Sequence, residues 1–251
     1  MHLAMVAKIT FKASRNRAAI VLRKPTAVTV EKSWKTLTDM ATITMPRNVL
    51  DFDKQKVKEL FKPDDPVVIE LGYNGQYITE FTGYISKVSA DVPIKIELED
   101  EMRIIRKIPV NASFARTSLK DLFKTLLPSY TVDALEVQLG AVRFAKTNMG
   151  QVLTYLKDEY SLYSYMKDGV LVCGKIYADD TTEDLKKYKV DGFTGNVATF
   201  GIPFIDHGYK VELTSAVYPD RNGTYYVERT KVNFDDTPQY RRTVELGDKV
   251  A

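Results

Sequence analysis

The fold of this chain is decided by one stretch, residues 65–85, which reads DPVVIELGYNGQYITEFTGYI. Apolar and polar side chains alternate on both sides of Asn74-Gly75, with the period of two that is typical of half-buried strands. Asn-Gly fits a type I′ turn, because both central residues of that turn need a positive φ. The stretch therefore predicts a β-hairpin, and Gly83 within its second strand indicates a bulge or a close backbone approach.

Strand patterns continue on both sides of the hairpin. Short apolar runs separated by polar residues fill residues 1–47, and residues 94–98 alternate strictly between apolar and charged side chains. Between the first strands and the hairpin, Asn48 predicts the start of a short amphipathic helix that ends at Pro63. A small antiparallel barrel or sheet accounts for residues 1–110.

The middle of the chain, residues 111–190, has a different character. Thr117 predicts the cap of an amphipathic helix, and Asn148 with Gln151 forms the capping pattern of a second one. Asp168-Gly169 predicts a tight turn between two further strands. This segment is expected to be an α/β insert, whose charged stretch 179–189 forms an exposed connection.

Residues 191–251 return to strand patterns, in four runs separated by turn residues. The sequence thus predicts a mainly β (α+β) fold with three parts. Two antiparallel β-barrel-like modules, residues 1–110 and 191–251, flank the α/β insert at residues 111–190.

Composition is that of a globular protein, with 44% hydrophobic and 27% charged residues. The formal net charge of +3 comes from 36 basic and 33 acidic residues. This net charge is too small to indicate electrostatic attraction of nucleic acid by the protein as a whole. A basic run near the amino terminus is interpreted as a face toward water or an acidic protein surface, rather than a nucleic-acid site. It comprises Lys8, Lys12, Arg15, Arg17, Arg23 and Lys24. No stretch approaches the roughly 20 apolar residues of a membrane span.

The sequence predicts no cofactor, metal or catalytic site. It contains neither a dinucleotide fingerprint nor a P-loop. Two histidines and one cysteine cannot assemble a zinc cluster within the chain. Cys173 lies in an apolar run and is interpreted as a buried, inert thiol, whereas His207 is interpreted as a surface turn residue. Trp34 is either an interface anchor or a half-buried core residue.

Two clusters of acidic side chains contain the residue types of a catalytic carboxyl pair but are interpreted as solvated charge. The first lies at a strand end and the second in the charged stretch 179–189 of the insert. The clusters are Glu97, Glu99, Asp100 and Glu101, and Asp179, Asp180, Glu183 and Asp184.

The hairpin and its surroundings resemble the first module of phage baseplate hub and late control D proteins. The order of features carries the resemblance: DPVVIELGYNG at residues 65–75, EFTGYI at 80–85, and IELEDEM at 96–102. The carboxyl end agrees, since GTYYV at 223–227 is followed by YRR at 240–242.

This resemblance implies a structural protein without enzymatic activity, a homotrimer that joins a tail tube protein to a spike protein and contacts other baseplate components. It further implies assembly in the bacterial cytoplasm and a final place in the baseplate of the virion tail. Aromatic and turn residues of the hairpin are candidates for the assembly interface, with core packing as their other role. They are Tyr73, Asn74, Gly75, Tyr77, Phe81 and Tyr84.

Two other functions stay open at this point. A polysaccharide-binding β protein would need exposed aromatic platforms, for which Tyr130, Tyr163 and Tyr165 are the candidates. A cell-wall hydrolase would need two carboxyl groups, one of them with a raised pKa.

Overall fold

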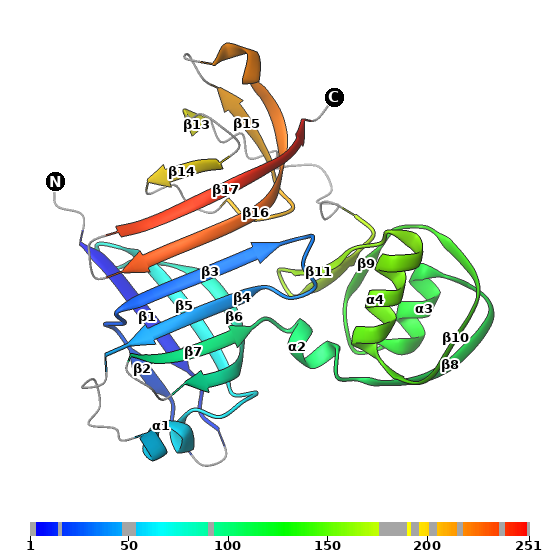
Figure 1. Cartoon of the computed structure of the whole chain (residues 1–251), viewed down its shortest axis with the longest axis horizontal. Helices are drawn as coiled ribbons and strands as arrows, with labels where there is room; N and C mark the ends of the chain where they lie inside the picture. Colours follow the sequence, from blue (N-terminus) through cyan, green and yellow to red (C-terminus); the bar gives the residue numbers. More distant parts are fainter. Residues whose placement is uncertain are drawn as a thin grey trace.

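One large, mostly antiparallel sheet dominates the computed structural model (Figure 1). The structure describes residues 4–14, 17–46, 54–89, 93–175, 190–191, 196–200, 205–214, 218–235 and 239–249. The main path of the sheet runs in the order β13-β15-β16-β3-β4-β7-β6-β5-β1-β2, and β17 joins β16 to β14. Its amino-terminal strands are β1 (Met5–Phe11), β2 (Ile20–Leu22), β3 (Ala27–Ser33), β4 (Met40–Met45), β5 (Pro66–Tyr73), β6 (Gln76–Ser89) and β7 (Ile94–Glu99).

The predicted hairpin is confirmed as β5 and β6. Asn74 and Gly75 have φ values of 52° and 83°, as the type I′ turn requires, and Tyr73 pairs with Gln76 across it. At Gly83 the backbones approach closely, because a Cβ there would lie 2.2 Å from the carbonyl oxygen of Glu99. The bulge in this pairing lies elsewhere, at Glu80.

The amino-terminal strands bury one apolar face. The fully buried side chains of this core alternate along each strand, because successive residues of a strand point to opposite faces. Helix α1 (Lys54–Leu60) covers part of this core with Val57, and Phe61 follows it. Its predicted start at Asn48 lies outside the described residues.

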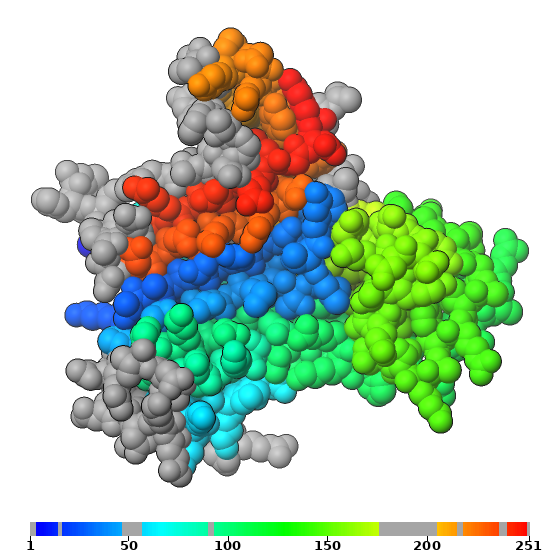
Figure 2. All heavy atoms as spheres, in the orientation of Figure 1, coloured from blue at the N-terminus to red at the C-terminus, as the bar shows by residue number. Residues whose placement is uncertain are grey.

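The insert forms a second body beside the sheet, as Figures 1 and 2 show. Its two long strands pair only with each other within the described chain, and the three short ones form a separate small sheet. Helices α3 and α4 pack their apolar faces into the common core of this body. The elements are α2 (Met102–Ile105), β8 (Pro109–Ser118), α3 (Leu119–Leu126), β9 (Val132–Ala134), β10 (Gln138–Asn148), α4 (Met149–Tyr160), β11 (Ser164–Lys167) and β12 (Val170–Cys173).

Local signals in the insert were read correctly with one exception. Asn148 and Gln151 form the complete capping box of α4. The predicted cap of α3 at Thr117 is wrong by one residue, because it is the Ser118 hydroxyl that accepts the N–H of Asp121. The turn at Asp168-Gly169 is confirmed, with φ values of 48° and 80°. The long strands β8 and β10 were not predicted.

The carboxyl-terminal strands extend the large sheet. They are β13 (Val190–Asp191), β14 (Asn196–Phe200), β15 (Lys210–Thr214), β16 (Gly223–Asp235) and β17 (Gln239–Lys249). The second half of β16, from Arg229 to Asp235, pairs with β3, and a small third core lies between β15, β16 and β17. The mainly β class with an α/β insert is confirmed. The limits of the three predicted parts stay a prediction, and β16 shows that sheet pairing crosses from the third part to the first.

Candidate functional site

The tip of the β5–β6 hairpin is fixed to the amino terminus and to β17. The Asn74 side chain accepts the N–H of Ala4 at 2.9 Å, and its own N–H donates to the Ala4 carbonyl at 2.7 Å. The Tyr73 hydroxyl donates to the Tyr240 carbonyl at 3.1 Å, and the two rings lie 5.3 Å apart. Asn74 and Gly75 are exposed, so of the candidate residues these two are presented most openly.

The other hairpin residues divide between core and surface. Phe81 is 3% exposed and belongs to the core, whereas Tyr77 and Tyr84 are half-buried. The proposed role of these residues in assembly stays a prediction, but Phe81 contributes through packing within the chain.

The bulge in β6 turns Glu80 inward, where it is fully buried. Arg242 of β17 pairs with the carboxylate at 2.6 Å, and the Tyr240 hydroxyl donates to it as well. Arg242 also donates to the Ile205 carbonyl at 2.7 Å. A buried charge needs a partner of opposite sign and further hydrogen bonds, and Glu80 has both.

A second buried ionic group joins the sheet, the insert and the carboxyl-terminal segment. Asp206, 3% exposed, accepts from Lys32 of β3 at 2.9 Å and lies 3.7 Å from Lys167 of β11. Lys167 donates to the His207 carbonyl at 3.1 Å. Burial acts to raise the pKa of Asp206, but the two lysines and His207 outweigh it and hold that pKa well below the usual value.

The interpretation of His207 as a surface residue is wrong, since it is 1% exposed. Its Nδ1 lies 3.0 Å from Asp206, and its ring packs edge-on against Tyr165 at 5.1 Å. Its Nε2 lies 4.0 Å from the carboxyl group of Asp39. No local pattern indicates this burial, because the residues that enclose His207 are distant along the chain.

The interpretation of the first acidic cluster as solvated is also wrong in part. Asp100 is 6% exposed, and one carboxyl oxygen accepts the N–H of Met102, the first residue of α2, at 3.1 Å. Burial, and then the neighbouring Asp39, raise the pKa of Asp100 well above its ordinary value. Burial raises the pKa of Asp39 too. Glu99 pairs instead with Arg106, at 2.5 Å. The second acidic cluster lies outside the described residues.

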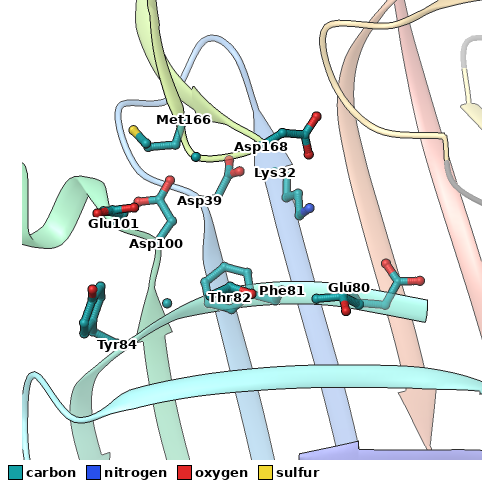
Figure 3. A pocket seen from close by; sticks show the side chains of 13 residues that line it. Lys32, Asp39, Glu80, Phe81, Thr82, Tyr84, Asp100, Glu101, Met166 and Asp168 are labelled. Atoms are coloured by element: carbon teal, nitrogen blue, oxygen red, sulfur yellow. The ribbon is translucent and has the colours of Figure 1, made fainter. Parts of the chain in front are cut away.

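Asp39 and Asp100 line a pocket of about 410 Å³ between the sheet and the β11–β12 turn (Figure 3). Glu80 and Lys32 form part of its wall, together with apolar side chains from β6 and β11. Sequence reasoning missed this pocket, because its residues come from four separate stretches of the chain. No group of His, Cys, Asp and Glu in the described part of the chain could hold a metal ion.

Cys173 is fully buried as predicted, and burial raises the pKa of its thiol to about 11, so it is a poor nucleophile. Trp34 is half-buried and packs edge-on against Tyr163 at 5.4 Å. Tyr165 is 1% exposed. Two of the three aromatic candidates for a polysaccharide platform are therefore engaged in packing. Tyr163 packs against the β3–β4 connection, and Tyr165 packs against the carboxyl-terminal segment.

The basic amino-terminal run serves the fold in part. The Arg17 guanidinium donates to the Lys12 carbonyl at 3.1 Å and pairs with Asp65 at 3.2 Å, and Lys8 pairs with Glu70 at 2.8 Å. Arg15 lies outside the described residues. None of the described helices is long and apolar enough to cross a membrane.

No protein-family model and no curated protein matches the chain. Solved structures do. A tail protein from Neisseria meningitidis MC58 aligns with a TM-score of 0.62 at 10% identity, over 98% of this chain and 97% of its own. The 43 kDa tail protein of prophage MuSo2 from Shewanella oneidensis gives a TM-score of 0.61 at 11% identity, over the same shares.

A component of the Escherichia coli type VI secretion system aligns with a TM-score of 0.59 at 11% identity, over 91% of this chain and 76% of its own. That protein is itself described as similar in structure to the T4 tail proteins gp27 and gp5. The resemblance that the hairpin sequence indicated is thereby confirmed at the level of the fold. This chain has the fold that phage tail proteins share with a component of the type VI secretion system.

Proposed function

We propose that this chain is a structural hub or adaptor of a contractile tail, in a phage, a prophage or a related injection system. It joins the tail tube to the central spike as a homotrimer and works without enzymatic turnover. One observation carries the proposal: the fold matches two tail proteins over nearly the whole of both chains. Because the alignment covers nearly all of each chain, the likeness supports a tail-associated structural role for the whole chain.

The sheet edges support assembly with neighbouring subunits. Within the described residues, β2 pairs with only Ile9–Phe11 of β1, so the outer edge of Met5–Lys8 has no strand beside it. β8 and β10 each have a single partner there. Exposed edges are liable to pair with other chains, and proteins of large assemblies cover them with neighbouring subunits.

The mass in solution tests the proposal. Light scattering over a range of concentrations, alone and with the tube and spike proteins of the same tail, should give a species of about 86 kDa, three times 28.5 kDa, or a complex containing three copies. A chain that remains monomeric in both mixtures and binds neither protein would overturn the hub role.

The hairpin tip can be tested separately with Asn74→Asp. Asp tolerates the positive φ and can still accept the Ala4 N–H, so the turn should survive while a charge is added to the tip. We expect the variant trimer to dissociate at a higher protein concentration than the parent trimer. The thermal midpoint of the variant should equal that of the parent chain. Thr154→Asp, at an exposed position of α4 and away from the open sheet edges, adds the same charge; it is the control and should assemble normally. Normal assembly of Asn74→Asp would remove the tip from the interface.

A further inference from the structure

The pocket between the sheet and the insert has acidic walls and an apolar side. Asp39, Asp100 and Glu101 face it from the ends of the strands, and Asp168 lies at its rim on the β11–β12 turn (Figure 3). Phe81 and Met166 provide apolar surface. This combination suits a ligand with a cationic head and an apolar stem.

The cations nearest to the pocket are already engaged. The Lys32 ammonium binds Asp206 at 2.9 Å, and the Arg242 guanidinium binds Glu80 at 2.6 Å. Burial and Asp39 head the influences on the pKa of Asp100, and both raise it. His207 and Lys32 act on the carboxyl group of Asp39, which in turn raises the pKa of Asp100. Asp100 itself forms no ion pair with a cation among the described residues.

Asp100 supplies the second, independent observation. The residue is 6% exposed, and its Oδ2 is buried and has no hydrogen-bond partner among the described residues. In Figure 3 its carboxyl group extends from the end of β7 toward the β11–β12 turn, across the pocket. Buried polar atoms are nearly always paired in native proteins, so an unpaired carboxyl oxygen at a pocket wall points to a missing donor.

We propose that this pocket binds the guanidinium or ammonium group of an arginine or lysine side chain carried by another polypeptide. The head group pairs with the carboxylates of Asp100 and Asp39, and the aliphatic stem lies along Phe81 and Met166. A planar guanidinium can donate to two carboxylates at once, which makes arginine the better fit. The proposal does not depend on the tail role, because it follows from the pocket alone.

Binding of short peptides to the full chain tests the site. Acetyl-Gly-Arg-Gly-amide and its lysine counterpart are titrated by calorimetry at about pH 8, where carboxyl groups tend to be ionised. The matching glutamine peptide is the neutral control, and spermidine represents a free polyamine. We expect saturable binding of one basic peptide per chain and none of the glutamine peptide. Basic peptides that bind no better than glutamine would overturn the proposal, as would binding of spermidine alone.

Three variants locate the binding. Asp100→Asn keeps the oxygen that accepts the Met102 N–H and removes the charge, so affinity for the arginine peptide should fall at least about tenfold. Asp168→Asn at the exposed rim should weaken it about two- to threefold, since exposed charges contribute less. Asp158→Asn, exposed on α4 and remote from the pocket lining, should bind like the parent chain.

Circular dichroism establishes that each variant is folded before titration. Parental affinity in folded Asp100→Asn would sink the site. If that variant does not fold, Asp168→Asn decides, and its unchanged affinity would count against the pocket.

Discussion

At the scale of single residues, buried ion pairs connect positions that are remote in sequence. Glu80 and Arg242 are 162 positions apart, and Lys32 and Asp206 are 174 apart. Each partner is tolerable inside the protein only because the other is present. Removing one member should therefore cost far more than removing a surface charge.

Arg242→Met tests this directly. It leaves the fully buried Glu80 without its counter-ion, so we expect the free energy of unfolding to fall by about 3–5 kcal/mol in urea denaturation at neutral pH. Lys120→Met, which breaks the exposed pair with Glu136, is the control and should leave the urea midpoint unchanged. Equal midpoints for the two variants would show that the Glu80 pair does not stabilise the fold.

Asp100→Asn should have the opposite effect and a clear pH dependence. The folded pKa of Asp100 is raised above its ordinary value of 3.8, so the folded state loses stability as pH rises from about that value through the folded pKa. The variant escapes this loss. We expect it to be more stable than the parent chain at about pH 8 and nearly equal to it at about pH 3. Urea midpoints at both pH values provide the measurement, and a variant less stable at the higher pH would contradict it.

At the scale of elements, β6 carries several functions in 14 residues. Its first residue pairs with Tyr73 across the hairpin turn, its bulge turns Glu80 inward, and Gly83 lets β7 approach. A strand with regular pairing throughout would place Glu80 on a different face, because neighbouring side chains of a strand point in opposite directions. The bulge is thus the local feature that makes the buried pair with Arg242 possible.

Two of the three glycines of the hairpin, Gly75 and Gly83, should respond differently to alanine. Gly75→Ala meets no atom within 4 Å, so only the positive φ opposes it, at about 1–2 kcal/mol. Gly83→Ala places a Cβ 2.2 Å from a backbone oxygen, which forces β6 and β7 apart and should cost at least about 2–3 kcal/mol. Guanidinium denaturation of both variants compares them, and a smaller loss for Gly83→Ala would argue against the close approach.

At the scale of the whole molecule, the ionic group around Asp206 joins the three main segments. Lys32 belongs to the amino-terminal strands, Lys167 to the insert, and Asp206 to the carboxyl-terminal segment. The insert and the sheet have separate apolar cores, so contacts of this kind matter for their relative position. We expect the cooperative unfolding of the three segments to depend on Asp206.

Asp206→Asn should lower the stability at neutral pH by about 3–5 kcal/mol, since Lys32 and Lys167 remain buried without their carboxylate. Because the folded pKa of Asp206 lies well below 3.8, its contribution is present above about that value and is lost as pH falls through the folded pKa. The difference between variant and parent should therefore shrink in strong acid. Hydrogen exchange should also show the carboxyl-terminal strands opening separately from the insert in the variant. A single transition with parental stability would contradict this role.

Local sequence signals determined the parts of this protein that depend on neighbouring residues. The Asn74-Gly75 turn, the capping box at Asn148 and the apolar run around Cys173 each act within a few positions, so their outcome could be predicted. The order of features in the hairpin also indicated the fold that this chain shares with tail proteins, because turn chemistry and strand alternation depend on neighbouring residues.

Only the tertiary structure decided the burial of His207 and Asp100, the pairing of β3 with β16, and the pocket between sheet and insert. An acidic residue has the same local pattern whether it faces water or a buried neighbour, since its environment is supplied by strands far along the chain. For the same reason no local pattern indicates the bulge at Glu80, although this bulge allows the buried contact between Glu80 and Arg242. Local chemistry thus specified the hairpin, and long-range strand pairing specified where its charges lie.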